Sequence, residues 1–133
     1  MAICKFTHLI DQGLPIPFFG DGLSRRDYTY IDDIVDGIMA AMNIRQPGHF
    51  IYNLGNSQTV SLTEMVAIIE KNLGKKAILQ KLPNQAGDVP ITYADLSKSK
   101  AELNFQPKVG LEEGIQRFIT WYQESTQNIS ERG

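Results

Sequence analysis

Apolar residues recur at helical spacing in three stretches of the chain, and each stretch predicts an amphipathic helix. The first covers residues 2–12 and the second covers residues 62–73. Ser61 precedes the second helix and Glu64 lies in its first turn, so the two residues can satisfy each other's backbone amides as a capping box. The third stretch covers residues 111–122. These three helices supply most of the predicted core.

Short extended segments lie between the helical stretches. We predict them at residues 14–19, 27–31, 50–55 and 77–82. Two prolines in the first segment forbid a helix there, and the last alternates as a half-buried strand does. The order mixes helices and strands without a continuous strand–helix–strand rhythm. It predicts an α/β fold that is too short for a complete doubly wound sheet.

A further helix is predicted to begin at Asp32 or Asp33, whose side chain would cap its first turn. Its predicted buried face consists of Ile34, Ile38, Ala41 and Met42. The adjacent carboxylates also suggest acid–base chemistry, but the helix cap explains them better. A shorter helix is predicted from Asp95 to about Leu103.

Composition narrows the possible functions. The 133 residues suffice for one domain, which we place at residues 1–124, followed by a polar tail at 125–133 that we expect to be disordered. A formal net charge of −2 gives no attraction to nucleic acid or to an anionic membrane. With Cys4 as the single cysteine and with His8 and His49 far apart, we expect no metal site. The sequence shows neither a membrane-spanning stretch nor a signal peptide, so we expect a cytoplasmic protein.

The segment from Gly20 to Tyr30 carries the main candidate chemistry. A Gly-Asp-Gly turn leads to Arg25 and Arg26, and an aromatic run follows. Arginine beside a flexible turn suits phosphate, because its planar guanidinium donates parallel hydrogen bonds to an oxyanion. The alternative is a surface ion pair between Arg26 and a nearby aspartate, and on these residues alone it is the commoner case.

Several motifs in a fixed order resemble the C-terminal part of the NAD-dependent nucleotide-sugar epimerases and dehydratases, which are extended short-chain dehydrogenases. The motifs lie at residues 20–28, 30–37, 52–55, 87–95 and 107–114. The nearest branch is that of the UDP-glucuronate 4-epimerases. The resemblance implies a substrate-binding portion, with helices packed on a few short strands and without the Rossmann nucleotide-binding core.

The resemblance also implies roles for individual residues. Arg26 matches the arginine that grips the UDP diphosphate, and Asp88 matches the acidic residue that accepts hydrogen bonds from the ribose hydroxyls. Pro17, Phe18 and Phe19 match the strand whose backbone lies along the uracil. These roles are chemically sensible, because a carboxylate can accept from two vicinal hydroxyls and backbone groups can match a uracil edge.

One position departs from the pattern of many UDP-hexose epimerases. Gln85 stands where those enzymes have a second phosphate-binding arginine. Glutamine donates hydrogen bonds without bringing a charge. The departure fits the uronate branch, and it leaves Arg25, or groups outside the chain, to supply further positive charge.

Two features that the family needs for catalysis have no counterpart in the sequence. The turn at residues 20–22 lacks the third glycine and the following helix of a dinucleotide site. No tyrosine precedes a lysine by four residues; after Tyr93, the fourth residue is Ser97 and lysine comes one position later. The resemblance implies NAD in the full-length enzyme, but we expect no cofactor to bind this chain alone and assign it no catalytic residue.

The sequence therefore predicts the UDP-sugar-binding part of a UDP-glucuronate 4-epimerase-like enzyme, inactive by itself. UDP-glucuronate or UDP-galacturonate is the expected ligand. The expected protein partner is the missing N-terminal half, or a second copy of the chain, because the helix at 32–43 and the strand at 50–54 would otherwise leave apolar faces uncovered. The alternatives are a stand-alone nucleotide-sugar-binding or regulatory module and an inactive remnant or fragment.

Overall fold

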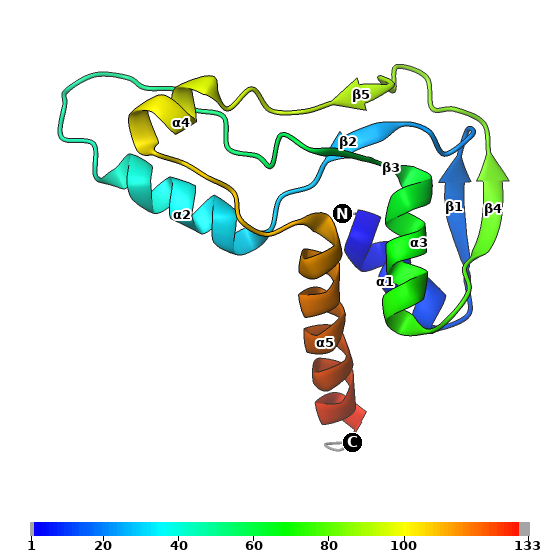
Figure 1. The fold of residues 1–133 in the computed structure, drawn as a ribbon. Helices are drawn as coiled ribbons and strands as arrows, with labels where there is room; N and C mark the ends of the chain where they lie inside the picture. Colours follow the sequence, from blue (N-terminus) through cyan, green and yellow to red (C-terminus); the bar gives the residue numbers. More distant parts are fainter. Residues whose placement is uncertain (1, 131–133) are drawn as a thin grey trace.

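The computed structural model describes residues 2–130, which form five helices and five short strands in a mixed α/β arrangement (Figure 1). In chain order the elements are α1 (Ala2–Asp11), β1 (Pro15–Phe19), β2 (Arg25–Asp27), α2 (Ile31–Met42), β3 (Thr59–Ser61), α3 (Leu62–Leu73), β4 (Ile78–Leu82), β5 (Ile91–Thr92), α4 (Ser97–Leu103) and α5 (Leu111–Ser130). The predicted fold class is confirmed.

The strands form two small sheets. In one, β1 runs parallel to β4, with Phe19 opposite Leu82. In the other, β2 lies between β3, to which it is antiparallel, and β5, to which it is parallel. Residues 20–24 lead from β1 to β2, and residues 83–90 lead from β4 to β5. Both loops therefore connect the same two sheets, and they lie close together at one end of the molecule (Figure 1).

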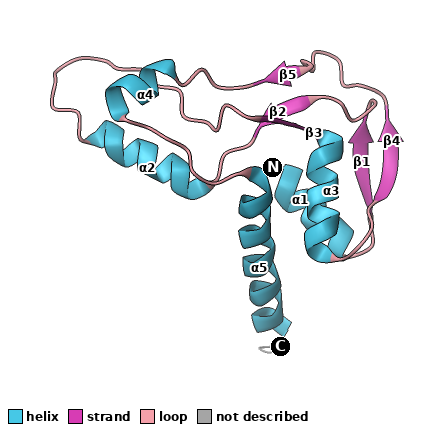
Figure 2. Ribbon diagram, viewed as in Figure 1, coloured by secondary structure: helices cyan, strands magenta, loops and turns pink. Residues whose placement is uncertain are grey.

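The main core lies where α1, α3 and α5 meet β1 (Figure 2). Its buried members are Phe6, Ile10, Ile16, Phe18, Met65, Val66, Ile69, Ile115 and Ile119. The helix α3 packs between α1 and α5, which are the elements it contacts most. All three helices follow the hydrophobic spacing predicted from the sequence, because one apolar face of each is buried in this cluster.

The predicted capping box of α3 is confirmed, and the structure shows a cap at the other end as well. The backbone amide of Glu64 donates to Ser61 Oγ, and the backbone amide of Ser61 donates to Glu64 Oε2. At the other end Gly74 has φ of 65°, the left-handed conformation that glycine adopts most easily. Local sequence signals therefore specify this helix completely.

The predicted strand at 27–31 is wrong in position. The paired residues are Arg25 to Asp27, because these are the residues that find partners in β3 and β5. The helix α2 begins at Ile31, which leaves only three residues between strand and helix.

The segment at 50–55 was predicted to be a strand but does not form one. A strand requires a neighbour that accepts and donates along its backbone, and within residues 2–130 no segment pairs with it. Ile51 on this segment is 83% exposed. The apolar sequence is present, but the neighbour that would turn it into a strand is not among the described residues.

The start of α2 also corrects the sequence prediction. Its N-cap residue is Tyr30, and no side chain caps the first turn. The buried carboxylate of Asp33 instead accepts hydrogen bonds from the backbone amides of Lys108 and Val109, at 2.9 and 3.1 Å. Asp33 therefore fastens α2 to the segment that leads into α5. Neither aspartate caps the helix in the way that we expected.

The predicted buried face of α2 is largely open. Ile38 is 47% exposed and Met42 is 72% exposed, whereas the buried positions of the helix are Asp33 and Gly37. The amphipathic pattern is real, but in the described chain much of the apolar side stays exposed, although α2 contacts α4. In Figure 1, α2 and α4 extend to the left of the main core.

The C-terminal helix is longer than the sequence suggests. Residues 125–130, which we expected to belong to a disordered tail, continue α5 as far as Ser130. Residues 125–130 contain neither glycine nor proline, the two residues that disfavour a helix most, so the sequence allows the helix to continue. Residues 131–133 lie outside the described part, and the domain division at residue 124 stays a prediction.

Candidate functional site

Arg26 and Asp88, 62 residues apart in sequence, form an ion pair. Arg26 lies on β2, opposite Val60 and Thr92 of the neighbouring strands. Its Nη1 donates to the backbone oxygen of Arg25 at 2.7 Å, and its Nη2 donates to Asp88 Oδ1. The Arg26 side chain is 26% exposed and the Asp88 side chain 44%, so both can be reached from solvent. The structure therefore brings together the two principal residues of the predicted substrate site.

The loop that carries Asp88 and Gln85, residues 83–90, is anchored at both ends. The Gly20 amide donates to Leu82 O at 2.9 Å, and the Arg25 amide donates to Pro90 O at 2.8 Å. Inside the loop the Asp88 amide donates to Gln85 O at 3.1 Å. Gln85 is exposed and turns the chain toward Asp88 through its carbonyl oxygen.

The turn at residues 20–22 lies directly against this loop. Gly20 has φ of 59°, and a Cβ atom there would lie 1.8 Å from Asn84 Oδ1. Gly22 has φ of 77°, and a Cβ atom there would lie 2.2 Å from the Phe18 ring. Both positions thus require glycine for conformation and for space. The turn can pass between the loop and the core only because these two side chains are missing.

Arg25 points away from the Arg26–Asp88 pair. Its Nε and Nη2 donate to the hydroxyl and carbonyl oxygens of Thr59 at 3.0 and 2.6 Å, and its Nη1 lies 3.2 Å from Glu64 Oε2. The backbone and side chain of Ser61, and then Arg25, hold the pKa of Glu64 below its ordinary value. Arg25 therefore ties β2 to β3 and to the first turn of α3, and its predicted part in ligand binding stays a prediction.

The three predicted residues of β1 divide between the two sides of the strand. Phe18 is buried in the core, whereas Pro17 and Phe19 are half-buried. In the described chain β1 pairs with a single strand, β4. The Phe18 side chain is thus committed to packing, and any contact of this strand with a uracil would come from its backbone or its other face.

Asp27 is a residue of the site that sequence reasoning missed. Its two carboxylate oxygens accept hydrogen bonds from three backbone amides, those of Asn56, Ser57 and Ala94, at 3.0, 2.9 and 3.1 Å. The sequence suggested only a possible ion pair with Arg26. The one signal in the sequence was the position of Asp27 between Arg26 and the aromatic run. That position does not indicate hydrogen-bond partners 29 to 67 residues further along the chain.

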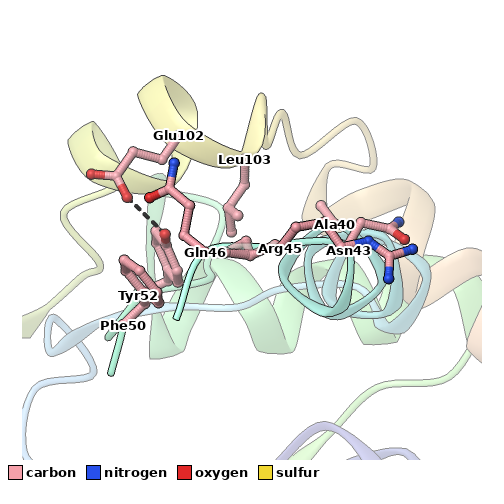
Figure 3. A pocket seen from close by; sticks show the side chains of 9 residues that line it. Ala40, Asn43, Arg45, Gln46, Phe50, Tyr52, Glu102 and Leu103 are labelled. Atoms are coloured by element: carbon pink, nitrogen blue, oxygen red, sulfur yellow. Dashed lines mark hydrogen bonds between the residues drawn. The ribbon is translucent and has the colours of Figure 1, made fainter. Parts of the chain in front are cut away.

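Two hollows lie outside this site. The larger, about 800 Å³, lies between α2, α4 and the loop that joins α2 to β3, and Tyr52 in its wall donates to Glu102 at 2.7 Å (Figure 3). This bond raises the pKa of Tyr52. The smaller, about 500 Å³, lies between α1, residues 27–31 and the start of α5. None of the seven predicted ligand residues lines either hollow.

Among the described residues, no three histidine, cysteine or acidic side chains are grouped as metal ligands. No described helix combines the length and apolar character needed to cross a membrane. The turn at 20–22 leads into β2 and not into a helix, so it lacks the helix N-terminus that holds a dinucleotide pyrophosphate. We therefore derive no step through NAD from this chain.

Comparison with known proteins decides the family. The residue pattern of the GDP-mannose 4,6 dehydratase family matches residues 1–118. The chain belongs to this family. The matched range includes Arg26, Asp88 and both loops that connect the two sheets.

Individual relatives are similar to nearly the whole chain. An uncharacterized protein of Methanocaldococcus jannaschii is 47% identical, over 94% of this chain and 38% of its own length. The UDP-glucuronate 4-epimerase of Thermodesulfobacterium geofontis is 39% identical, over 97% of this chain and 40% of its own length. The chain thus spans about two fifths of the length of these relatives. The resemblance to part of an NAD-dependent epimerase is confirmed.

Solved structures agree with the fold. MoeE5, in complex with UDP-glucuronic acid and NAD, superposes with a TM-score of 0.88 at 30% identity, over 94% of this chain and 42% of its own. The UDP-glucuronic acid 4-epimerase of Bacillus cereus, also in complex with UDP-glucuronic acid and NAD, superposes with a TM-score of 0.81 at 32% identity, over 87% of this chain and 37% of its own.

Proposed function

We propose that this chain is the UDP-sugar-binding part of a UDP-glucuronate 4-epimerase-like enzyme that works in the cytoplasm. The observation that carries the proposal is the accessible ion pair between Arg26, on the middle strand of the three-stranded sheet, and Asp88, on the loop at residues 83–90. One group suits a diphosphate and the other suits a vicinal diol, which are the two polar parts of a nucleoside diphosphate. Complexes of MoeE5 with UDP-glucuronic acid and UDP-glucose support this choice of ligand.

Each predicted residue except Arg25 has a place in the proposal. Arg26 holds the diphosphate and Asp88 accepts from the ribose hydroxyls. Residues 17–19 offer the backbone edge of β1 to the uracil. Gln85 supplies a neutral donor on the same loop as Asp88. UDP-glucuronate or UDP-galacturonate is the preferred ligand within this proposal, because the motifs fit the uronate branch.

The chemistry belongs to the complete enzyme. NAD, held by the part of the protein that this chain does not span, would take and return a hydride at C4 of the sugar. This chain would hold the nucleotide end of the substrate, and binding energy from that remote end positions the reacting centre. We assign no catalytic residue to the chain.

The expected partner is the remaining, nucleotide-binding part of such an enzyme. Two features support it: the open apolar side of α2, and the segment at 50–54, which has a strand-like sequence and no strand neighbour in the described chain. Without that partner we expect a second copy of the chain to cover the same surfaces.

Calorimetric titration of the purified chain with UDP, UDP-glucuronate and NAD tests the proposal. We expect UDP and UDP-glucuronate to bind and Arg26→Ala to abolish binding. Arg45→Ala removes an exposed arginine at the far hollow and serves as the matched control, with unchanged affinity expected. Binding of UDP that survives Arg26→Ala would contradict the assigned site.

A second experiment separates the alternatives. The part of the Thermodesulfobacterium geofontis enzyme that this chain does not span is produced separately and mixed with it. Epimerisation by the mixture supports the proposed part-enzyme. Binding of UDP-sugar with no activity in a folded, associated pair favours the stand-alone binding module, and no binding in either state favours the inactive remnant.

A further inference from the structure

The Arg26–Asp88 pair joins the two groups that the proposed ligand must contact. In Arg26, Nη1 donates to the backbone oxygen of Arg25 and Nη2 donates to Asp88, so the Asp88 carboxylate occupies one end of the guanidinium. An oxyanion that binds this end competes with Asp88 for Nη2. In the same way, the guanidinium sits at the carboxylate that would accept from a diol.

This pair is also the main link between the loop and the body of the protein. Residues 83–90 are exposed throughout. In the described chain, the one side-chain hydrogen bond or ion pair from this loop runs from Asp88 to Arg26. Breaking the pair therefore frees the middle of the loop, while its two ends stay anchored next to Leu82 and Pro90.

The balance of charges predicts how ligands compete with the pair. A half-exposed ion pair is weak, so a ligand can displace it. A ligand that satisfies only Arg26 leaves the Asp88 carboxylate without its cation and next to the new anion. A ligand that satisfies only Asp88 leaves Arg26 without its anion. A ligand with both groups replaces the pair without leaving either charge unmatched.

We propose that Arg26 and Asp88 form an internal latch, which selects ligands that carry an anion and a vicinal diol together. This inference rests on the proposed function and adds a mechanism of selection to it. An anion at Arg26 releases Asp88, so it prepares the diol site, and by thermodynamic linkage a diol at Asp88 prepares the anion site to the same extent. The two parts of the ligand therefore bind cooperatively.

Inorganic phosphate and uridine test the latch as separate probes, followed by amide chemical shifts in NMR titrations. In the native chain we expect saturating phosphate to tighten uridine binding by about twofold to fivefold, the fold-change that corresponds to a weak exposed ion pair. In Asp88→Asn we expect phosphate to bind tighter by a similar factor and the coupling to uridine to vanish. Amide hydrogen exchange in residues 83–90 should also be faster in this variant.

Asp36→Asn is the matched control, because it removes an equal charge from another exposed ion pair, the one with Lys108. We expect it to leave both affinities and their coupling unchanged. Simple charge repulsion by Asp88 would tighten phosphate in Asp88→Asn without any coupling to uridine in the native chain, and that result would overturn the latch.

The outcomes also separate the latch from the proposed function. If the native chain binds UDP but binds phosphate and uridine independently of each other, the result contradicts the latch and leaves the proposed function standing. A second outcome is that the native chain binds no UDP, while Asp88→Asn binds phosphate and shows faster amide hydrogen exchange in residues 83–90. This outcome supports the latch and contradicts the proposed function of the isolated chain. Absence of binding by both forms, with unchanged exchange, overturns both.

Discussion

Asp27 determines the position of two loops with a single side chain. Three backbone amides, from Asn56, Ser57 and Ala94, converge on its carboxylate beside Arg26. Ser57 has φ of 59°, an uncommon conformation for a residue other than glycine, and its amide is one of the three donors. The carboxylate therefore holds a turn that the local sequence would not favour.

We expect Asp27→Asn to lower the free energy of unfolding by about 2 kcal/mol, because bonds to a charged acceptor are lost and the new NH₂ group faces backbone donors. Urea denaturation measures this loss. Asp21→Asn is the control, since Asp21 accepts from one backbone amide, that of Leu23, in an exposed turn. Equal losses in the two variants would show that Asp27 has no special positioning role.

Single carboxylates such as Glu70 also determine how the stability of the protein depends on pH. The Ala77 amide, and then Lys76, hold the pKa of Glu70 below its ordinary value of 4.5. A lowered folded-state pKa stabilises the protein above the unfolded value, and this contribution disappears as the pH falls through the folded value. We expect thermal stability to decline below about pH 4.5, with a shallower decline in Glu70→Gln. An identical pH profile for the variant would contradict this.

At the scale of elements, α3 is specified by its own residues. Ser61 is buried and bonds reciprocally with Glu64 at the start of the helix. We expect Ser61→Ala to cost about 1 kcal/mol of stability, because the backbone amide of Glu64 loses its acceptor, Ser61 Oγ. Thr120→Ala removes a hydroxyl from an exposed position within α5 and should have little effect. Guanidinium denaturation compares the two variants, and no difference between them would contradict the role of the cap.

The elements also show where sequence reasoning works and where it fails. The capping box and apolar spacing of α3 are local, so the sequence predicts this helix fully. The partners of Asp27 and Asp33 are backbone amides from 29 to 76 residues away, which no residue pattern identifies. The segment at 50–55 fails for a related reason: its apolar and aromatic residues suggest a strand, but strand pairing depends on a neighbour. The family resemblance implied roles for Arg26 and Asp88 at one ligand, but nothing in the sequence predicted the ion pair between them.

At the scale of the whole molecule, the exposed apolar side of α2 is the feature that most disfavours the isolated chain in water. Ile31, Val35, Ile38 and Met42 lie at helical spacing on one side and are all exposed. We expect the isolated chain to self-associate through this side. In the double variant Val35→Lys/Met42→Lys, we expect self-association to require a protein concentration at least about tenfold higher than in the native chain. Sedimentation velocity over a range of protein concentrations measures this. Leu23→Lys changes an equally exposed residue in a loop and should have no effect. A monomeric native chain at high concentration would contradict this prediction.

The two sheets each take strands from both the first and the second half of the chain. β1 and β2 precede the exposed connection at residues 45–49, whereas β3, β4 and β5 follow it. Asp27 and Asp33 likewise lie before that connection, and all their backbone donors lie after it. The part of the chain before this connection and the part after it are therefore interleaved in both sheets. A protease that nicks the chain between Arg45 and His49 should leave two pieces that migrate separately in denaturing gels but elute together under native conditions.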